Sequence, residues 1–283
     1  MDKKDIVLSN YAAAFIDILG QRDQFHGCGL LPESKDEIVT VARRTIEVVS
    51  WLHASFEDFY SALTNRPEAV NVSEEHQQEL QKLKKIGLKF QRFSDGLVVY
   101  QSLFGDPRPE AINGLYGLIA TCGSLCLIGL NRGTPIRAGI DVAWGLELND
   151  NELYGCVLAK AYELESETAK YPRIVVGEHV RTYLSWGMKV PGNDVQSTFT
   201  RDMASICLGL LGEDSDGNII VDYLGLGFRK HIASTLEATD YQSAYSYIEG
   251  QIAHAKVVQN KKLQQRYEMV KQYFDRNRSR WEN

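Results

Sequence analysis

The sequence lacks the features typical of membrane-spanning, secreted, disulfide-bonded and zinc-binding proteins. It has no run of about 18 apolar residues, so we expect no transmembrane helix. Residues 1–5 are charged and lack the apolar region of a signal peptide, which makes the cytoplasm the expected location. The five cysteines include no C-x-x-C pair, and no two histidines show H-x-x-x-H spacing. We therefore expect neither disulfides nor a structural zinc ion.

Motifs for binding common nucleotide cofactors are also missing. There is no G-x-x-x-x-G-K-[ST] phosphate loop, and residues 225–227 (GLG) lack the third glycine of a dinucleotide-binding turn. Acidic residues outnumber basic ones by 37 to 31, which gives a net charge of −6. This balance argues against nucleic acid or a membrane as a general partner, but it permits a local cationic pocket for one small anion.

The pattern of apolar residues predicts an α+β protein. We expect strands over residues 11–19, 88–93, 97–103 and 134–144, and helices over 35–65, 74–85 and 109–130. This β-α(α)-β-β-α-β order is that of a ferredoxin-like (split βαβ) fold, with helices on one face of the sheet. Residues 8–180 would form this core. Residues 181–283 would be a mainly helical C-terminal extension of the same domain.

Two of the expected strands each carry one aspartate among apolar residues. Asp17 lies in residues 15–20 (FIDILG), and Asp95 lies in residues 93–99 (FSDGLVV). A carboxylate in such a strand is costly unless something compensates its charge. Taken singly, each aspartate is more simply a turn or strand-end residue. In the split βαβ order, however, the two become neighbours, and together they could hold Mg²⁺ or Mn²⁺.

The residues after Asp17 suggest where phosphate oxygens would bind. Backbone N–H groups at Leu19 and Gly20 could cradle a phosphate, because a glycine lets the ligand approach closely. Phe15 could stack near a nucleotide, although a phenylalanine in a strand is more often part of the core. Arg137 lies inside a strand, and we expect it to pair with Asp141, Glu152 or Glu163.

Several segments together resemble the class III nucleotide cyclases. They are the two aspartate motifs, residues 136–141 (IRAGID) and residues 154–165 (YGCVLAKAYELE), and the resemblance covers roughly residues 11 to 180. It implies a lyase that joins the 3′-hydroxyl of a nucleoside triphosphate to its α-phosphate and releases pyrophosphate. It also implies two Mn²⁺ or Mg²⁺ ions held by Asp17, Asp95 and the carbonyl of Ile18. Such enzymes are usually homodimers with active sites at the interface.

Departures from the purine cyclases point to a subgroup. Gln91, followed by Arg92, occupies the place of a purine-selecting lysine, and Ala159 and Glu163 replace the usual asparagine and arginine. The motifs are more similar to the pyrimidine cyclases of bacterial Pycsar antiphage systems. That resemblance implies UTP, or less favourably CTP, as substrate, a cyclic UMP messenger for antiviral defence, and Arg92 as a substrate-binding residue.

Two other functions stay open at this point. The missing asparagine and arginine favour a degenerate cyclase-like module that binds a nucleotide without converting it. A purine or dinucleotide cyclase is the other alternative. Elsewhere in the chain, residues 214–217 (DSDG) superficially suggest a calcium loop, but they lack the full set of ligands, so we expect a β-turn.

Overall fold

We describe the fold from a computed structural model, which defines residues 8–21, 32, 34–65, 87–93, 95–103, 110–149, 152–232 and 238–282. The expected helix over 74–85 lies outside these residues. The elements of the amino-terminal half are β1 (Ser9–Ile18), α2 (Lys35–Val41), the π-helical η1 (Ala42–Ile46), α3 (Glu47–Thr64), β2 (Lys89–Phe93), β3 (Gly96–Ser102), α5 (Glu110–Asn131), β4 (Ile136–Asn149) and β5 (Glu152–Tyr154).

The second half begins with α6 (Cys156–Glu163), the π-helical η3 (Leu164–Ala169) and β6 (Ile174–Val176). It continues with α7 (Glu178–Gly187), α8 (Val195–Gly209), β7 (Leu211–Glu213), β8 (Ile219–Val221), α9 (Leu226–Ile232), α10 (Ala238–Val257), α11 (Lys261–Arg276) and α12 (Arg278–Trp281).

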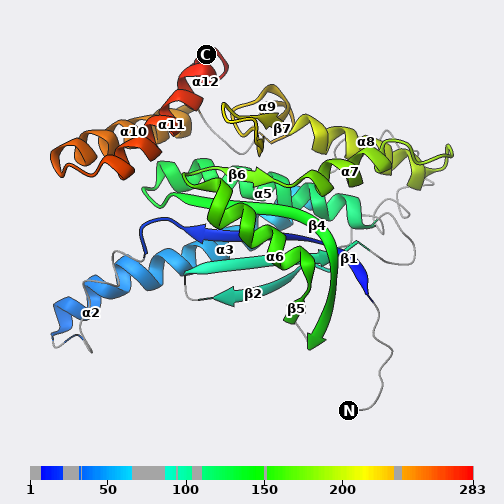
Figure 1. Cartoon of the computed structure of the whole chain (residues 1–283), viewed down its shortest axis with the longest axis horizontal. Helices are drawn as coiled ribbons and strands as arrows, with labels where there is room; N and C mark the ends of the chain where they lie inside the picture. The colour runs from blue at the N-terminus through cyan, green and yellow to red at the C-terminus, as the bar shows by residue number, and fades with distance from the viewer. Residues whose placement is uncertain are drawn as a thin grey trace.

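The strands form one mixed sheet in the order β2-β3-β1-β4-β6-β8-β7, with β5 paired to β4 beside this path (Figure 1). The contact of β4 with β6 is parallel, and the other pairings are antiparallel. The predicted α+β class and split βαβ order are therefore confirmed. As expected, β1 lies in the middle, between the β2–β3 hairpin and β4. Because β7 and β8 join the same sheet, residues 181–283 also add two strands to the core.

Alternation along β1 decides which side of the sheet each residue faces. Ala12, Ala14, Ile16 and Ile18 are almost completely buried in the main core, which α3 and α5 cover. Tyr11 and Ala13 belong to a second, smaller cluster on the opposite face, together with residues of α6. The expectation of helices on one face thus holds for α3 and α5, but α6 covers part of the face that carries Asp17.

A glycine lets α6 approach the sheet this closely. A Cβ atom on Gly139 of β4 would lie only 2.2 Å from the carbonyl oxygen of Ala161. Any side chain at position 139 would therefore push α6 and η3 away from the sheet. This contact matters because η3, which follows α6 directly, carries a residue of the candidate site.

The central helix α5 is long and apolar enough to cross a membrane by composition alone. A 20-residue window, Ile112–Asn131, passes that test, but 94% of it is buried inside the protein. It lies against α3, α8 and α10 as well as the sheet. In the described part of the chain, α5 is therefore explained as the central helix of the core.

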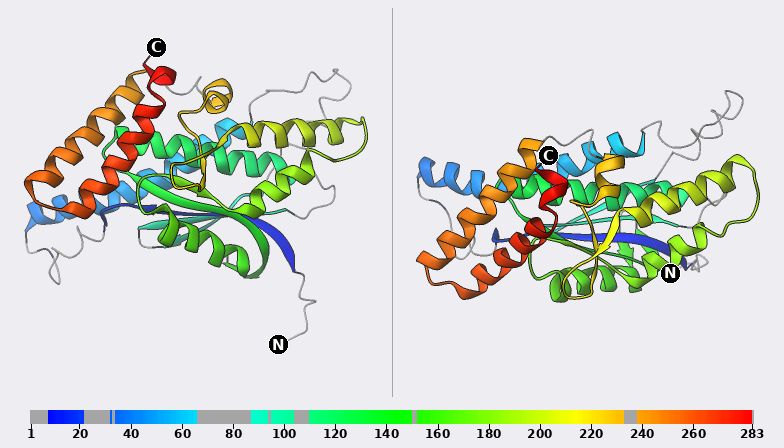
Figure 2. Two further views of the ribbon diagram at one scale, coloured as in Figure 1. Left: turned by 45° about the horizontal axis from the view of Figure 1, so that its top comes forward. Right: turned by 90° about the horizontal axis from the view of Figure 1, so that it is seen from above.

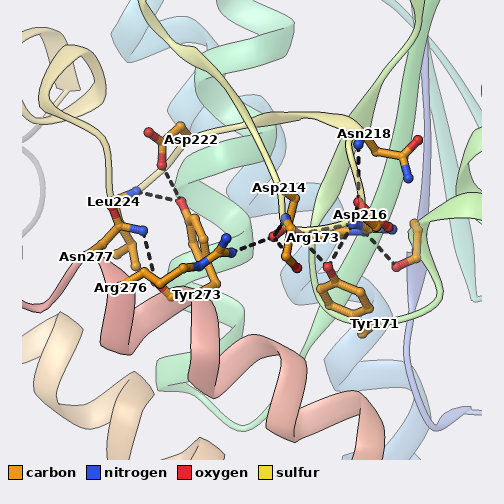
Figure 3. Close-up of polar contacts among 12 residues, drawn as sticks. Tyr171, Arg173, Asp214, Asp216, Asn218, Asp222, Leu224, Tyr273, Arg276 and Asn277 are labelled. Carbon is orange, nitrogen blue, oxygen red and sulfur yellow. Dashed lines mark hydrogen bonds and ion pairs between the residues drawn. The ribbon is translucent and has the colours of Figure 1, made fainter.

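The C-terminal helices are tied to the sheet by a buried arginine (Figure 3). Arg173, which precedes β6, binds Asp214 at 3.1 Å and Asp216 at 2.7 Å. Tyr171 also donates a hydrogen bond to Asp214, and Arg276 of α11 reaches the same carboxylate at 2.7 Å. The segment around Asp214 is a turn, as expected. Its two carboxylates, which would bind the ion in a calcium loop, bind the guanidinium groups of arginines here.

We predict that Arg173→Met lowers the free energy of unfolding by about 3 kcal/mol, because the buried Asp214 loses one of its two guanidinium partners and Asp216 loses its ion pair. Urea denaturation of the full chain measures this change. The control is Arg278→Met, which removes an exposed pair with Glu282 and should cost at most about 1 kcal/mol. Equal losses in the two variants would contradict a structural role for Arg173.

Candidate metal and nucleotide site

The ends of three neighbouring strands bring the candidate site together. Asp17, one residue before the end of β1, lies opposite Gly96 of β3 on one side and Arg137 of β4 on the other. Asp95 directly precedes Gly96, so the two aspartates meet at the same end of the sheet. Ile18, whose carbonyl is the third expected metal ligand, is the last residue of β1 and lies opposite Ile136.

Arg137 lies between two carboxylates. Its Nη2 atom is 3.2 Å from Oδ2 of Asp17, and its Nε atom is 2.5 Å from Oε1 of Glu165. The side chain of Glu165 is only 3% exposed. The expectation that Arg137 pairs with Asp141, Glu152 or Glu163 is therefore wrong, because η3 crosses over β4 and places Glu165 above Arg137.

Burial and mutual repulsion shape the charges of this cluster. Burial raises the pKa of Asp17, and the nearby Asp95 adds to this effect, while Arg137 opposes it. Burial, followed by the charge of Asp17, raises the pKa of Glu165 to about 7 although Arg137 lowers it. When all are ionised, three carboxylates face one guanidinium, which leaves a formal excess of two negative charges.

That excess fits a divalent cation. Among the described residues, no group of three or more His, Cys, Asp or Glu side chains has metal-binding geometry. A cation here would therefore rely on the two aspartates, backbone oxygen and the oxygens of a phosphate ligand, which is how Mg²⁺ is usually bound. Asp17 already forms an ion pair with Arg137, so a bound cation would share the Asp17 carboxylate with this arginine.

An exposed aromatic cluster lies beside the aspartates. Phe15 of β1 contacts Phe93 of β2 with ring centroids 6.1 Å apart and Tyr162 of α6 with centroids 5.1 Å apart. Phe93 and Tyr162 are 44% and 53% exposed. Phe15 shares the face of Asp17, because both are odd-numbered residues of β1. Exposed rings of this kind are suitable for stacking against a planar base.

Gln91, which occupies the place of the purine-selecting lysine, and Arg92, the expected substrate-binding residue, face opposite sides of the sheet. Arg92 pairs with Leu97, on the side covered by α3, and its Nη2 atom is 2.9 Å from Oε1 of Glu57. Gln91 faces the side of Phe15 and Asp17, and its buried Oε1 atom has no hydrogen-bond partner. The structure therefore brings Gln91, and not Arg92, to the same side of the sheet as the two aspartates.

One of the two backbone N–H groups expected to bind phosphate already makes a hydrogen bond within the protein. The N–H group of Leu19 donates to the carbonyl of Pro135 at 2.9 Å, so it does not face a ligand. Gly20 has a φ of 92°, a conformation that favours glycine, and a Cβ atom there would meet nothing within 4 Å. Of the two residues expected to bind phosphate, Gly20 is the one with open space beside it.

Sequence reasoning missed Glu165, Phe93 and Tyr162 as parts of this site. For Glu165 a signal was present, because it follows Val157 and Ala161 at intervals of four residues. Both of these residues pack on the sheet. Helical periodicity therefore pointed Glu165 toward the sheet. Phe93 and Tyr162 gave no comparable signal, since the place of Phe93 depends on the register of β2 with β3, and that of Tyr162 depends on how α6 crosses the strands.

Comparison with known proteins adds little. No protein-family model and no curated protein matches the sequence. Among solved structures, a bacterial light-regulated adenylyl cyclase matches with a TM-score of 0.39 and 12% sequence identity. The match covers 81% of this chain and 100% of that chain. Similarity at this level does not establish what this chain does.

We predict that Glu165→Gln stabilises the protein more as the pH rises. The folded state raises the pKa of Glu165 from an ordinary 4.5 to about 7, so it binds a proton that the unfolded chain releases. Relative to the variant, the free energy of unfolding of the natural protein should therefore fall by about 3 kcal/mol in total as the pH rises from 4.5 to 7. Urea denaturation across this pH range measures the difference.

The matched control for this measurement is Glu163→Gln, which changes an exposed glutamate at the end of α6. Its stability should follow that of the natural protein at every pH. A constant difference between Glu165→Gln and the natural protein would refute the raised pKa.

Proposed function

We propose that this protein is a metal-dependent nucleotide cyclase, which converts a nucleoside triphosphate to its 3′,5′-cyclic monophosphate and pyrophosphate. The observation that carries the proposal is the meeting of Asp17 and Asp95 at the ends of β1 and β3, with an excess of negative charge around them. The resemblance of the two aspartate motifs to class III cyclases supports the same function.

The residues have separate roles in this proposal. Asp17, Asp95 and the Ile18 carbonyl would hold Mn²⁺ or Mg²⁺, which lowers the pKa of the 3′-hydroxyl and neutralises charge on the α-phosphate. The 3′-hydroxyl would give its proton to water, and the bond from the 3′ oxygen to the α-phosphorus would form as the bond to pyrophosphate breaks. Arg137 keeps Asp17 oriented, and Gly20 leaves room for the phosphates.

We infer that the substrate is a pyrimidine nucleotide, UTP in preference to CTP, and that the product serves as an antiviral messenger. The sequence resemblance to Pycsar cyclases supports this inference. Gln91, on the face of the sheet that carries Phe15 and Asp17, would take over the base-reading role first assigned to Arg92. A side-chain carbonyl accepts a hydrogen bond, so it suits the N–H edge of uracil. Phe15, Phe93 and Tyr162 would stack on the base.

One observation favours a second candidate, a module that binds the nucleotide without converting it. Asp17 is already paired with Arg137, and in such a module this ion pair would persist when the nucleotide binds. The two candidates differ in pyrophosphate release. Calorimetry that detects nucleotide binding in Mn²⁺, without pyrophosphate release, would favour the module.

We predict that the natural protein, incubated with ATP, GTP, CTP and UTP in Mn²⁺, forms a cyclic product from UTP most rapidly. Asp17→Ala and Asp95→Ala should each abolish this product, because each removes a metal ligand. Mass spectrometry identifies the product, and a pyrophosphate assay follows its rate. Activity retained in either variant would sink the two-metal assignment.

Two further variants make this experiment specific. Asp58→Ala, which changes an exposed aspartate of α3, should leave the rate unchanged. Phe93→Ala should raise KM about tenfold with little change in kcat, because loss of a stacking ring weakens binding by roughly 1–2 kcal/mol. Thermal melting monitored by circular dichroism checks that every variant is folded.

We also propose a homodimer with active sites at its interface. The resemblance implies this arrangement, and the exposed rings of Phe93 and Tyr162 offer a second copy a surface to cover. Sedimentation equilibrium of the full chain should give twice the mass of one protomer. Replacing both rings with alanine should weaken the dimer, whereas a single-protomer mass for the natural protein at all concentrations would contradict it.

A further inference from the structure

The helical hairpin of α10 and α11 ends in a compact tip that projects beyond the sheet (Figures 1 and 2). Residues 256–262 form this tip, which we call the hairpin tip. The turn is held by backbone hydrogen bonds from Val258 to His254 and from Asn260 to Ala255, and Gln259 adopts a φ of 55°. The side chain of Asn260 also caps α11. The tip therefore presents its side chains on a fixed backbone.

Two adjacent valines are exposed on this tip. Val257 is 82% exposed and Val258 is 51% exposed. The apolar residues that precede them in α10, Ile252 and Ala255, are buried. The valines therefore do not contribute to the packing of the hairpin, although their backbone is well fixed. A pair of aliphatic side chains held out at a rigid turn suits insertion into an apolar layer.

The surroundings of the valines are strongly basic in a chain that is acidic overall. Lys256, Lys261 and Lys262 are exposed, and residues 250–267 contain no aspartate or glutamate, while the whole chain has a net charge of −6. By contrast, Lys271 further along α11 is paired with Asp275 and Glu249. The tip is thus a local cationic surface around an aliphatic centre.

We propose that the hairpin tip binds the surface of an anionic phospholipid bilayer, with Val257 and Val258 inserted at the headgroup boundary and the three lysines on acidic headgroups. Charge complementarity selects an anionic partner. The aliphatic centre selects lipid over nucleic acid, because single-stranded nucleic acid is bound on aromatic side chains, and residues 250–266 contain none. This departs from the expectation of no membrane partner, which rested on the net charge of the whole chain.

Flotation of the full chain with vesicles tests this proposal. We expect binding to vesicles of equal parts phosphatidylcholine and phosphatidylserine at low salt, reduced by added salt, and none to phosphatidylcholine alone. The triple variant K256E/K261E/K262E should weaken binding about 100-fold or more, since each lysine near an anionic surface contributes about fivefold. V257S/V258S should weaken it about tenfold, because serine removes the inserted apolar groups.

The matched control is K35E/K189E/K230E, which reverses three exposed lysines elsewhere and changes the net charge equally. It should keep most of the binding. Three results would overturn the proposal: no binding of the natural protein, equal loss in the two triple variants, or binding to a single-stranded oligonucleotide but not to vesicles. Because all altered side chains are exposed, thermal melting should be similar in every variant.

Discussion

The central position of β1 constrains the rest of the structure. An antiparallel neighbour on each side fixes its register, and the alternation of its residues assigns every second side chain to the α3–α5 core. The remaining side chains face α6. Since a shift of one residue would exchange the two faces, Asp17 can only lie on the face of α6, between Gly96 and Arg137. The location of the candidate site follows from this one strand.

The periodicity of apolar residues was sufficient to predict the strands and helices whose apolar pattern is long and uninterrupted. The β1 strand, the β2–β3 hairpin and α5 lie within a few residues of their expected bounds, and their order gave the fold class. No bounds were predicted for α7, α8 and β7: the helices lie largely in the region expected to be mainly helical, and the three-residue β7 is too short to give a clear pattern. The β4 strand extends to Asn149, five residues beyond expectation, where β5 pairs with it.

The candidate site was harder to predict, because it depends on contacts between distant segments. The meeting of Asp17 and Asp95 followed from strand order alone. The partner of Arg137 did not, since the sequence offered several acidic residues and only the crossing of η3 over β4 selects Glu165. Gln91 and Arg92 are adjacent, so a one-residue difference in register decides which of them faces the site. The sequence did not specify that register.

Arg173, which is buried, and Arg137, which is partly buried, each bind two carboxylates, and they differ in how fully their partners are satisfied. Arg173 uses its Nε, Nη1 and Nη2 atoms as donors to carboxylates, a phenol oxygen and carbonyls, and hydrogen bonds from Arg173 lower the pKa of Asp216. That network is saturated, and a further cation would gain nothing there. Around Arg137, by contrast, burial raises the pKa values of Asp17 and Glu165, and a single guanidinium faces the carboxyl groups of these two residues and the nearby Asp95. Groups with perturbed pKa values are often found at functional sites, and the divalent cation and phosphate substrate proposed above would supply the positive charge and ligand atoms that this cluster lacks.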